Sequence, residues 1–149
     1  MKIDHTDLRI AEFKDIEKLV EIRSKAILAQ PATIWSKEHL RQVADFYGTQ
    51  HFTNEFPQLK HYILEDYAFV ANKFDYLSYL FILPEYQGKG IGAKLLGFIE
   101  SKMREEGASQ SWLWAHPYAE KFYENHGYSV NGEVYAPFGN DLKKMIKRF

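Results

Sequence analysis

The residues with the clearest chemical potential are the glycines of Gln87-Gly88-Lys89-Gly90-Ile91-Gly92, which stand between a predicted strand and a predicted helix. Such a segment can present backbone N–H groups at a helix N-terminus, where these donors and the positive end of the helix dipole hold a pyrophosphate. Glycine suits this role because a Cβ would block close approach of the backbone, and Lys89 can add a positive charge. The same glycines also fit a flexible turn that merely starts a helix, and taken alone they favour neither interpretation.

Two other phosphate-binding motifs fit this segment less well. Gly88-x-Gly90-x-x-Ala93 matches the spacing of the dinucleotide fingerprint, but residues 84–87 separate it from the strand, and the next strand, Trp112 to Ala115, ends without an acidic residue. A P-loop needs Ser or Thr after its lysine, whereas Lys89 is followed by glycine. The sequence therefore argues against both nucleotide motifs.

The spacing of apolar residues predicts the elements that must position the glycine segment. Strands are predicted at residues 8–11, 61–66, 68–71, 77–83, 112–115 and 128–130, with a hairpin turn at 72–75. Helices are predicted from Asp15 to Ala29, from Ser36 to a stop at Gly48, from the glycine segment to about Glu106 with Gly107 as its cap, and from Tyr118 to His126 with Gly127 closing it. Residues 49–60 show no clear period. The tail residues Leu142, Met145, Ile146 and Phe149 fit a helical stripe, although the interleaved basic residues leave a strand open.

This order of elements predicts a mixed α/β (α+β) domain that spans residues 1–149. The later strand–helix–strand–helix–strand run implies at least one parallel pair with a right-handed crossover. The hairpin before it implies antiparallel strands.

Composition narrows the class of protein further. The formal net charge is −1, which gives no overall field for nucleic acid or an anionic membrane, and the chain has no cysteine for disulfides or thiol chemistry. Residues 1–10 lack the apolar core of a signal peptide, so a cytoplasmic protein is the default expectation. The six histidines show no metal-ligand spacing and no H-E-x-x-H, so no metal site is predicted.

Two segments carry a family likeness. Leu80 to Gly92 resembles the acyl-CoA signature of the GNAT superfamily, Arg/Gln-x-x-Gly-x-Gly/Ala, which here has Gln87, Gly90 and Gly92. Ala119 to Tyr128 resembles the second signature of the same family, Ala-x-x-Phe-Tyr-Glu-x-x-Gly-Phe/Tyr. The two signatures occur in the family order, and together they are more specific than either alone.

This resemblance implies a GNAT-like fold with a mixed central sheet of about six to seven strands, splayed parallel central strands and about four helices. It also favours a final strand over the helical stripe in the tail. The implied activity is N-acetyl transfer from acetyl-CoA to a primary amine of a small molecule or peptide, by direct attack in a ternary complex. An alternative is a catalytically weak CoA-binding or sensing module. Dimers are common in such enzymes, although nothing in the sequence specifies a homodimer.

The resemblance also assigns residues. The pantetheine arm of CoA would lie between the strand at 77–83 and the strand at 112–115, and the glycine loop would hold the pyrophosphate. The implied cofactor-binding residues are Phe81, Ile82, Leu83, Gln87, Gly88, Lys89, Gly90, Ile91, Gly92 and Ala93. Tyr123 stands where the family has its general-acid tyrosine.

The general base is less defined. His116 stands where the family often has Asn; it ends the second splayed strand, and a pKa near neutrality would let it take a proton. Glu65 and Asp75 are further candidates. The acceptor site is expected to be built from residues 31–60 and the tail, and the sequence does not name the acceptor.

Overall fold

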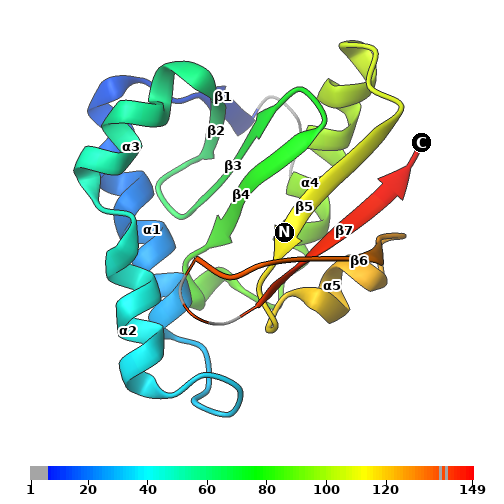
Figure 1. The fold of residues 1–149 in the computed structure, drawn as a ribbon. Coiled ribbons are helices and arrows are strands. Elements are labelled where there is room, and N and C mark those ends of the chain that lie inside the picture. Colours follow the sequence, from blue (N-terminus) through cyan, green and yellow to red (C-terminus); the bar gives the residue numbers. More distant parts are fainter. Residues whose placement is uncertain (1–6, 138, 140) are drawn as a thin grey trace.

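The computed structural model describes residues 7–137, 139 and 141–149, so Asp4 and His5 of the N-terminal segment lie outside the described residues. Its centre is a seven-stranded mixed sheet with the strand order β1-β2-β3-β4-β5-β7-β6 (Figure 1). Neighbouring strands are antiparallel except β4 and β5, which are parallel. This agrees with the mixed GNAT-like sheet that the sequence predicts.

The elements follow one another in the chain with short connections. The strands are β1 (Leu8–Ile10), β2 (Lys60–Leu64), β3 (Ala68–Lys73), β4 (Tyr76–Ile82), β5 (Gln110–Ala115), β6 (Ser129–Tyr135) and β7 (Leu142–Arg148). The helices are α1 (Ile16–Leu28), α2 (Lys37–Phe46), α3 (Thr49–Glu55), α4 (Ile91–Glu105) and α5 (Glu120–Glu124), with 3-10 turns η2 (Phe13–Asp15), η3 (Phe56–Gln58) and η4 (Pro84–Tyr86).

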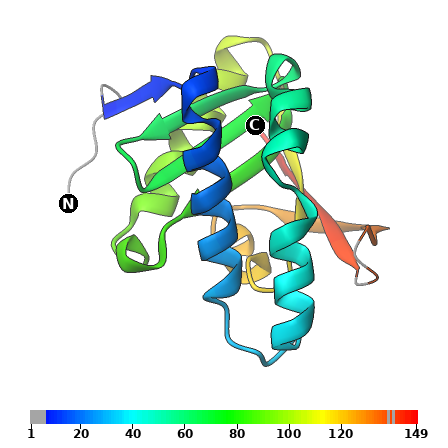
Figure 2. The same ribbon diagram turned by 90° about the vertical axis from the view of Figure 1, so that its left-hand side faces the viewer.

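Helices cover both faces of the sheet. Helices α1, α2 and α3 lie on one face, and α4 and α5 lie on the other (Figures 1 and 2). The main core joins α1, α3 and α4 to the central strands, and Leu19, Phe69 and Leu95 are fully buried in it. A smaller core around Trp35 holds α2 against the end of α1 and against Leu142 of β7.

Of three helix caps predicted from the sequence, the structure has the one at Ser36 and lacks those at Asp15 and Gly48. Ser36 caps α2 as predicted, and its Oγ accepts a hydrogen bond from the His39 N–H at 3.0 Å. Asp15 stands at the N-cap position of α1, but its carboxylate accepts from the Glu12 N–H at 2.7 Å and pairs with the Arg9 guanidinium at 2.8 Å. The hydrogen bond from Arg9 lowers the pKa of Asp15 to about 2. Gly48 has a φ of −91° and starts α3 instead of closing α2.

The segment at 49–60, which shows no clear period, forms α3 and the turn η3. Helix α3 is only 7 residues long, so it presents too few turns for a helical stripe to stand out in the sequence. The hairpin turn lies at residues 74–75, where Phe74 has a φ of 51°, while Asn72 still belongs to β3.

The tail is a strand, so the helical stripe read from its apolar residues is wrong and the expectation from the family likeness is confirmed. Strand β7 lies between β5 and β6 and pairs with both, which satisfies its backbone groups on two edges. Its basic residues find acidic partners: Lys144 pairs with Glu133 at 3.2 Å and Lys147 with Glu100 at 3.0 Å. Tertiary pairing therefore overrides the local pattern in this segment.

Candidate active site

The two parallel strands β4 and β5 meet at one end only. Tyr76 and Trp112 are their only registered partners in the described chain, and the Trp112 N–H donates to the Asp75 carbonyl at 2.9 Å. The Asp75 carboxylate accepts from the Trp112 indole at 3.2 Å, and the rings of Tyr76 and Trp112 stack at 4.3 Å. Beyond this junction the strands separate toward their C-terminal ends, as the family likeness implies.

A bulge in β4 lies beside this junction. Ala71 pairs with Tyr79 and Asn72 with Leu77, so Ser78 is an extra residue in β4, and its hydroxyl donates to the Ala71 carbonyl at 3.1 Å. A bulge bends and twists its strand. The bend therefore helps β4 to turn away from β5 just after the point where they pair.

The gap between the strands is lined by backbone groups of particular residues. The Leu83 N–H donates to the Tyr67 carbonyl at 2.8 Å, which puts the hydrogen-bonding groups of Leu83 and, by alternation, Phe81 toward β3. Those of Leu80 and Ile82 therefore face the gap, and the Gln87 side-chain amide donates to the Ile82 carbonyl at 2.9 Å. Phe81 and Leu83 thus present their backbone groups to β3 and not to the gap, which does not fit the expectation that these groups bind the pantetheine.

The glycine segment forms a concave set of donors at the start of α4. Gly88 and Gly90 have φ values of 75° and 81°, a left-handed conformation that glycine adopts without strain. The first hydrogen bond of the helix runs from the Lys94 N–H to the Gly90 carbonyl at 3.3 Å. Within the described part of the chain, the backbone N–H groups of residues 88–93 have no acceptor. Unpaired N–H groups at a helix N-terminus are suited to an anion.

Gly92 has a packing role that its place in the motif does not indicate. A Cβ on Gly92 would lie 3.2 Å from the ring of Phe122, which belongs to α5, and 3.6 Å from Ile82 of β4. The absence of a side chain lets α5 approach the start of α4. The two segments that resemble family signatures are therefore in direct contact.

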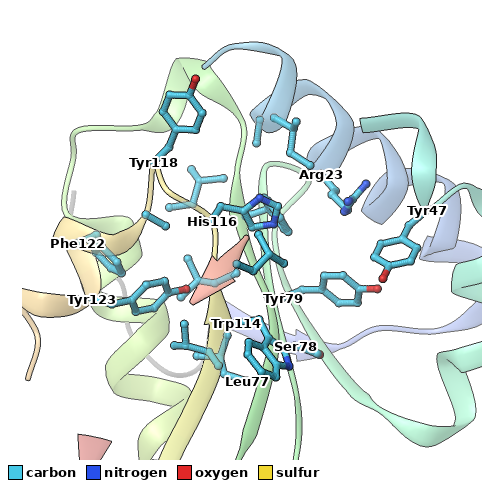
Figure 3. Close-up of a pocket in the computed structure, with 18 of the residues that line it drawn as sticks. Arg23, Tyr47, Leu77, Ser78, Tyr79, Trp114, His116, Tyr118, Phe122 and Tyr123 are labelled. Atoms are coloured by element: carbon cyan, nitrogen blue, oxygen red, sulfur yellow. The ribbon is translucent and has the colours of Figure 1, made fainter. Parts of the chain in front are cut away.

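One cleft of about 460 Å³ joins these features. It passes Gln87 and Gly92 near the glycine segment, then Leu80, Leu113 and Tyr123 between the separated strands, and it ends among side chains of α2, α3 and β6. Figure 3 shows the Tyr123 hydroxyl directed toward the middle of the cleft, near His116, and the Tyr79 hydroxyl directed away from Tyr123, toward Tyr47. A long molecule and a second, smaller one could therefore meet inside the protein.

Comparison with known proteins assigns the family. The model of the acetyltransferase (GNAT) domain matches residues 32–149. The chain belongs to the GNAT acetyltransferase family.

Individual relatives agree with this GNAT assignment. An uncharacterized acetyltransferase of Streptococcus pyogenes is 34% identical over 71 residues, which are 48% of this chain and 49% of the relative. The chain thus spans about half the length of the curated relatives that it matches.

Solved structures share the fold over the whole chain. A GCN5-related N-acetyltransferase from Rhodopseudomonas palustris has a TM-score of 0.82 at 20% identity, with 100% of this chain and 99% of that chain covered. PaiA N-acetyltransferase from Thermoplasma acidophilum, solved in complex with coenzyme A, has a TM-score of 0.78 at 23% identity, with 100% of both chains covered. YncA from Salmonella typhimurium, solved with its cofactor acetyl-CoA, has a TM-score of 0.63 at 20% identity, with 95% and 92% covered.

Tyr123, the residue at the position of the GNAT general-acid tyrosine, is buried on α5 with its hydroxyl directed into the cleft (Figure 3). Burial raises the pKa of Tyr123 far above the usual tyrosine range, because the phenolate would be poorly solvated. The hydroxyl therefore stays protonated at neutral pH and can donate a hydrogen bond.

His116 also lines the cleft, where its ring contacts Trp35 at 5.5 Å and Phe81 at 6.5 Å between centroids. Burial, with the nearby positive charge of Arg23, lowers the pKa of His116 to about 4. The expectation of a pKa near neutrality is therefore wrong. His116 is neutral at pH 7, and it is a weaker base than a solvated histidine.

The segment at 31–60, where the acceptor site is expected, contributes side chains to the cleft. Six residues of this segment line the cleft: Trp35, Leu40, Tyr47, His51, Glu55 and Leu59. The hydroxyl of Tyr118 holds the start of the segment in place, since it accepts from the Trp35 N–H at 2.9 Å and donates to the Pro31 carbonyl at 2.7 Å. The one available sequence signal is the spacing of His51 and Glu55, which puts them on the same face of a helix.

Neither of the other two candidate bases belongs to the cleft. Glu65 lies in the turn between β2 and β3 with a φ of 51°, and Asp75 holds the junction of β4 and β5. Among the described residues, no group of three or more metal-ligating side chains could hold an ion, and none of the helices described is long and apolar enough to cross a membrane.

Proposed function

We propose that this GNAT protein is an acetyl-CoA-dependent N-acetyltransferase that transfers an acetyl group to a primary amine by direct attack in a ternary complex. The observation that carries the proposal is one cleft that reaches Gln87 and Gly92, beside the start of α4, and passes between β4 and β5 to the aromatic end. Coenzyme A and acetyl-CoA in two structures of the same fold support the choice of ligand.

The chain has groups that fit the parts of this co-substrate. The N–H groups of residues 88–93 would bind the pyrophosphate, and Lys89, whose ammonium lies 5.4 Å from the centroid of the Tyr86 ring, would add charge beside it. The backbone groups of Leu80 and Ile82 would bind the pantetheine as an added strand does. When bound, acetyl-CoA supplies the acetyl group as a reactive thioester.

The residues at the centre of the cleft would then act on the reacting atoms. An N–H of Leu80 or Ile82 would stabilise negative charge on the thioester oxygen. The Tyr123 hydroxyl would donate its proton toward the leaving sulfur. Neutral His116 would accept a hydrogen bond from the incoming amine and orient it. Holding both reactants in one cleft supplies much of the rate.

Two measurements test this function. Thermal-shift titration should show stabilisation by acetyl-CoA and by CoA but not by a nicotinamide dinucleotide. Thiol release from acetyl-CoA should then appear with at least one member of a panel made of 2-phenylethylamine, tyramine, putrescine, spermidine, free amino acids and a tripeptide. Binding without thiol release on any amine would support the CoA-sensing alternative, and stabilisation by the dinucleotide alone would refute CoA binding.

The cellular setting is also part of the proposal. We place the enzyme in the cytoplasm, where acetyl-CoA is supplied by metabolism, and a homodimer remains compatible with the family. Fractionation of cells and light scattering of the purified protein check these two points.

A further inference from the structure

The acceptor end of the cleft holds a chain of three polar side chains. The Tyr79 hydroxyl, on β4, donates a hydrogen bond to Oε1 of Glu55, at the end of α3. Oε2 of Glu55 pairs with Nε2 of His51 at 3.2 Å, one helical turn earlier on α3. All three residues line the cleft, and the His51 side chain is 41% exposed. The linked side chains therefore extend from the cleft to solvent.

Aromatic rings pack against two members of this Tyr79–Glu55–His51 network. Tyr79 stacks on Phe52 at 5.0 Å, and His51 stacks on the ring of Tyr47 at 4.0 Å. Tyr79 stands two residues before Phe81 in β4, and its hydroxyl points away from Tyr123, toward Tyr47 (Figure 3). An amine held on the Tyr47 side of the cleft would lie beside the Tyr79–Glu55 pair.

The proposed reaction needs a proton acceptor that the centre of the cleft does not offer. An alkylamine is an ammonium ion at neutral pH and must lose a proton before its nitrogen can attack. His116 is a weak base for this purpose, and it lies near the positive charge of Arg23. Glu55 is the one carboxylate among the described residues that line the cleft.

We propose that Glu55 is the general base of this acetyltransferase, reached through Tyr79, and that His51 returns the proton to solvent. The acceptor's N–H bond breaks as its proton passes to the Tyr79 oxygen, and the hydroxyl proton of Tyr79 passes to Oε1 of Glu55. The amine keeps the electron pair, and Glu55 becomes a neutral carboxylic acid. Between turnovers Glu55 ionises again as its proton leaves through His51 to water. This inference rests on the proposed function.

Among the described residues, three other titratable groups interact electrostatically with Glu55. They are Arg23 of α1, Tyr47 at the end of α2 and Tyr76 of β4. Arg23 is the cation of this set: its guanidinium donates to the carbonyls of Val43 and Ala44 at 3.2 Å and lies 4.9 Å from the centroid of the Tyr47 ring. Tyr47 and Tyr76 stay neutral near pH 7, because burial raises the pKa of Tyr76 to about 12 and that of Tyr47 above its usual range.

The test compares Glu55→Gln and Tyr79→Phe with the wild type in the pH dependence of kcat/KM, using the amine of the panel that gives the fastest thiol release. Both changes keep the size of the side chain and remove the proton path. We expect kcat/KM near neutral pH to fall about 100-fold in each variant, the low end of what a general base contributes. The difference in kcat/KM between each variant and the wild type should become steadily smaller as the pH rises, because the fraction of free amine increases and a free amine needs no base.

His51 and a control complete the design. His51→Gln should lower kcat, and added imidazole should restore it by taking the proton from Glu55. Glu105→Gln changes an exposed carboxylate on α4, outside the cleft, and should leave the profile unchanged. Acetyl-CoA affinity, measured by thermal shift, should stay the same in all four variants.

The outcomes separate the two proposals. A wild type that acetylates no amine of the panel refutes the proposed function itself. A wild type that is active, with Glu55→Gln or Tyr79→Phe showing an unchanged profile, overturns the relay. A uniform loss at every pH together with a lowered Tm would show that the network is only structural. Full activity in His51→Gln removes His51 from the exit path.

Discussion

At the scale of single residues, burial in the same cleft has opposite effects on the pKa values of Tyr123 and His116. Burial keeps Tyr123 protonated, while burial and Arg23 keep His116 unprotonated. Both shifts follow from the cost of charge away from water. The first suits donation to a leaving thiolate, and the second takes His116 out of the usual role of a histidine near neutral pH. The sequence predicts where these residues lie in the chain, but it cannot predict the solvation that decides their pKa values.

Tyr123→Phe tests the donor. The change keeps the buried ring and removes only the hydroxyl, so we expect kcat to fall about 100-fold, within the range seen for general acids. CoA affinity should stay within about twofold, because the lost hydrogen bond forms only as the thiolate leaves. Steady-state kinetics and a CoA titration measure the two effects. An unchanged rate of the chemical step in single-turnover experiments would rule out the donor role.

At the scale of elements, the start of α4 combines two requirements on glycine. Gly88 and Gly90 need a left-handed backbone, whereas Gly92 needs the space that Phe122 fills. The motif spacing indicates a phosphate site but does not distinguish these roles. The contact between Gly92 and Phe122 holds the start of α4 against α5, so the two signature segments pack on each other.

Gly90→Val tests the donor set at the start of α4. A Cβ at this position meets no atom within 4 Å, so packing tolerates it, but the φ of 81° is unfavourable for a β-branched residue. We expect the loop to shift and the Kd for CoA to rise at least about tenfold, the equivalent of about 1.4 kcal/mol. Isothermal titration measures this affinity. Unchanged affinity would argue against the loop as the pyrophosphate site.

Gly97→Ala is the matched control on the same helix. Gly97 lies in the exposed middle of α4, and a Cβ there also meets nothing within 4 Å. We expect the free energy of unfolding to rise by about 0.5–1 kcal/mol, because alanine loses less backbone entropy than glycine in a helix. Chemical denaturation measures the stability, and CoA affinity should not change. A loss of stability would mean that α4 is strained there.

At the scale of the whole molecule, the histidine in the core makes stability depend on pH. His61 is 2% exposed among Phe52, Phe69 and Tyr79, its two ring nitrogens have no hydrogen-bond partner in the described residues, and burial lowers its pKa from 6.5 to about 4. Between pH 6.5 and about 4, His61 is protonated in the unfolded chain and neutral in the folded chain. Stability is therefore lost as the pH falls from 6.5 toward 4, and His61 has no such effect above this window.

The variant His61→Leu should remove the part of the acid sensitivity that comes from His61, while His116, whose pKa is also lowered to about 4, keeps its own part. A lowering from 6.5 to about 4 corresponds to a loss on the order of 3 kcal/mol once the pH is below both values. The difference in unfolding free energy between variant and wild type should thus shift in favour of the variant as the pH falls, whatever its value at pH 7. Urea denaturation across this range measures the difference. A difference that does not change with pH would contradict the assignment of acid sensitivity to His61.

The sequence by itself determined the cofactor end of the protein. The unpaired N–H donors at the start of a helix belong to consecutive residues. The glycine spacing, with a strand before it and a helix after it, can therefore be recognised from the local sequence. The family likeness of residues 80–92 and 119–128 added the splayed parallel strands at the centre and the final strand of the sheet. Only the tertiary structure decided the acceptor end. Tyr79, Glu55 and Arg23 come from three separate elements, and their meeting depends on how α1 and α3 pack on β4. Strand alternation likewise decided that Leu80 and Ile82, rather than Phe81 and Leu83, face the gap, because that choice depends on the pairing with β3.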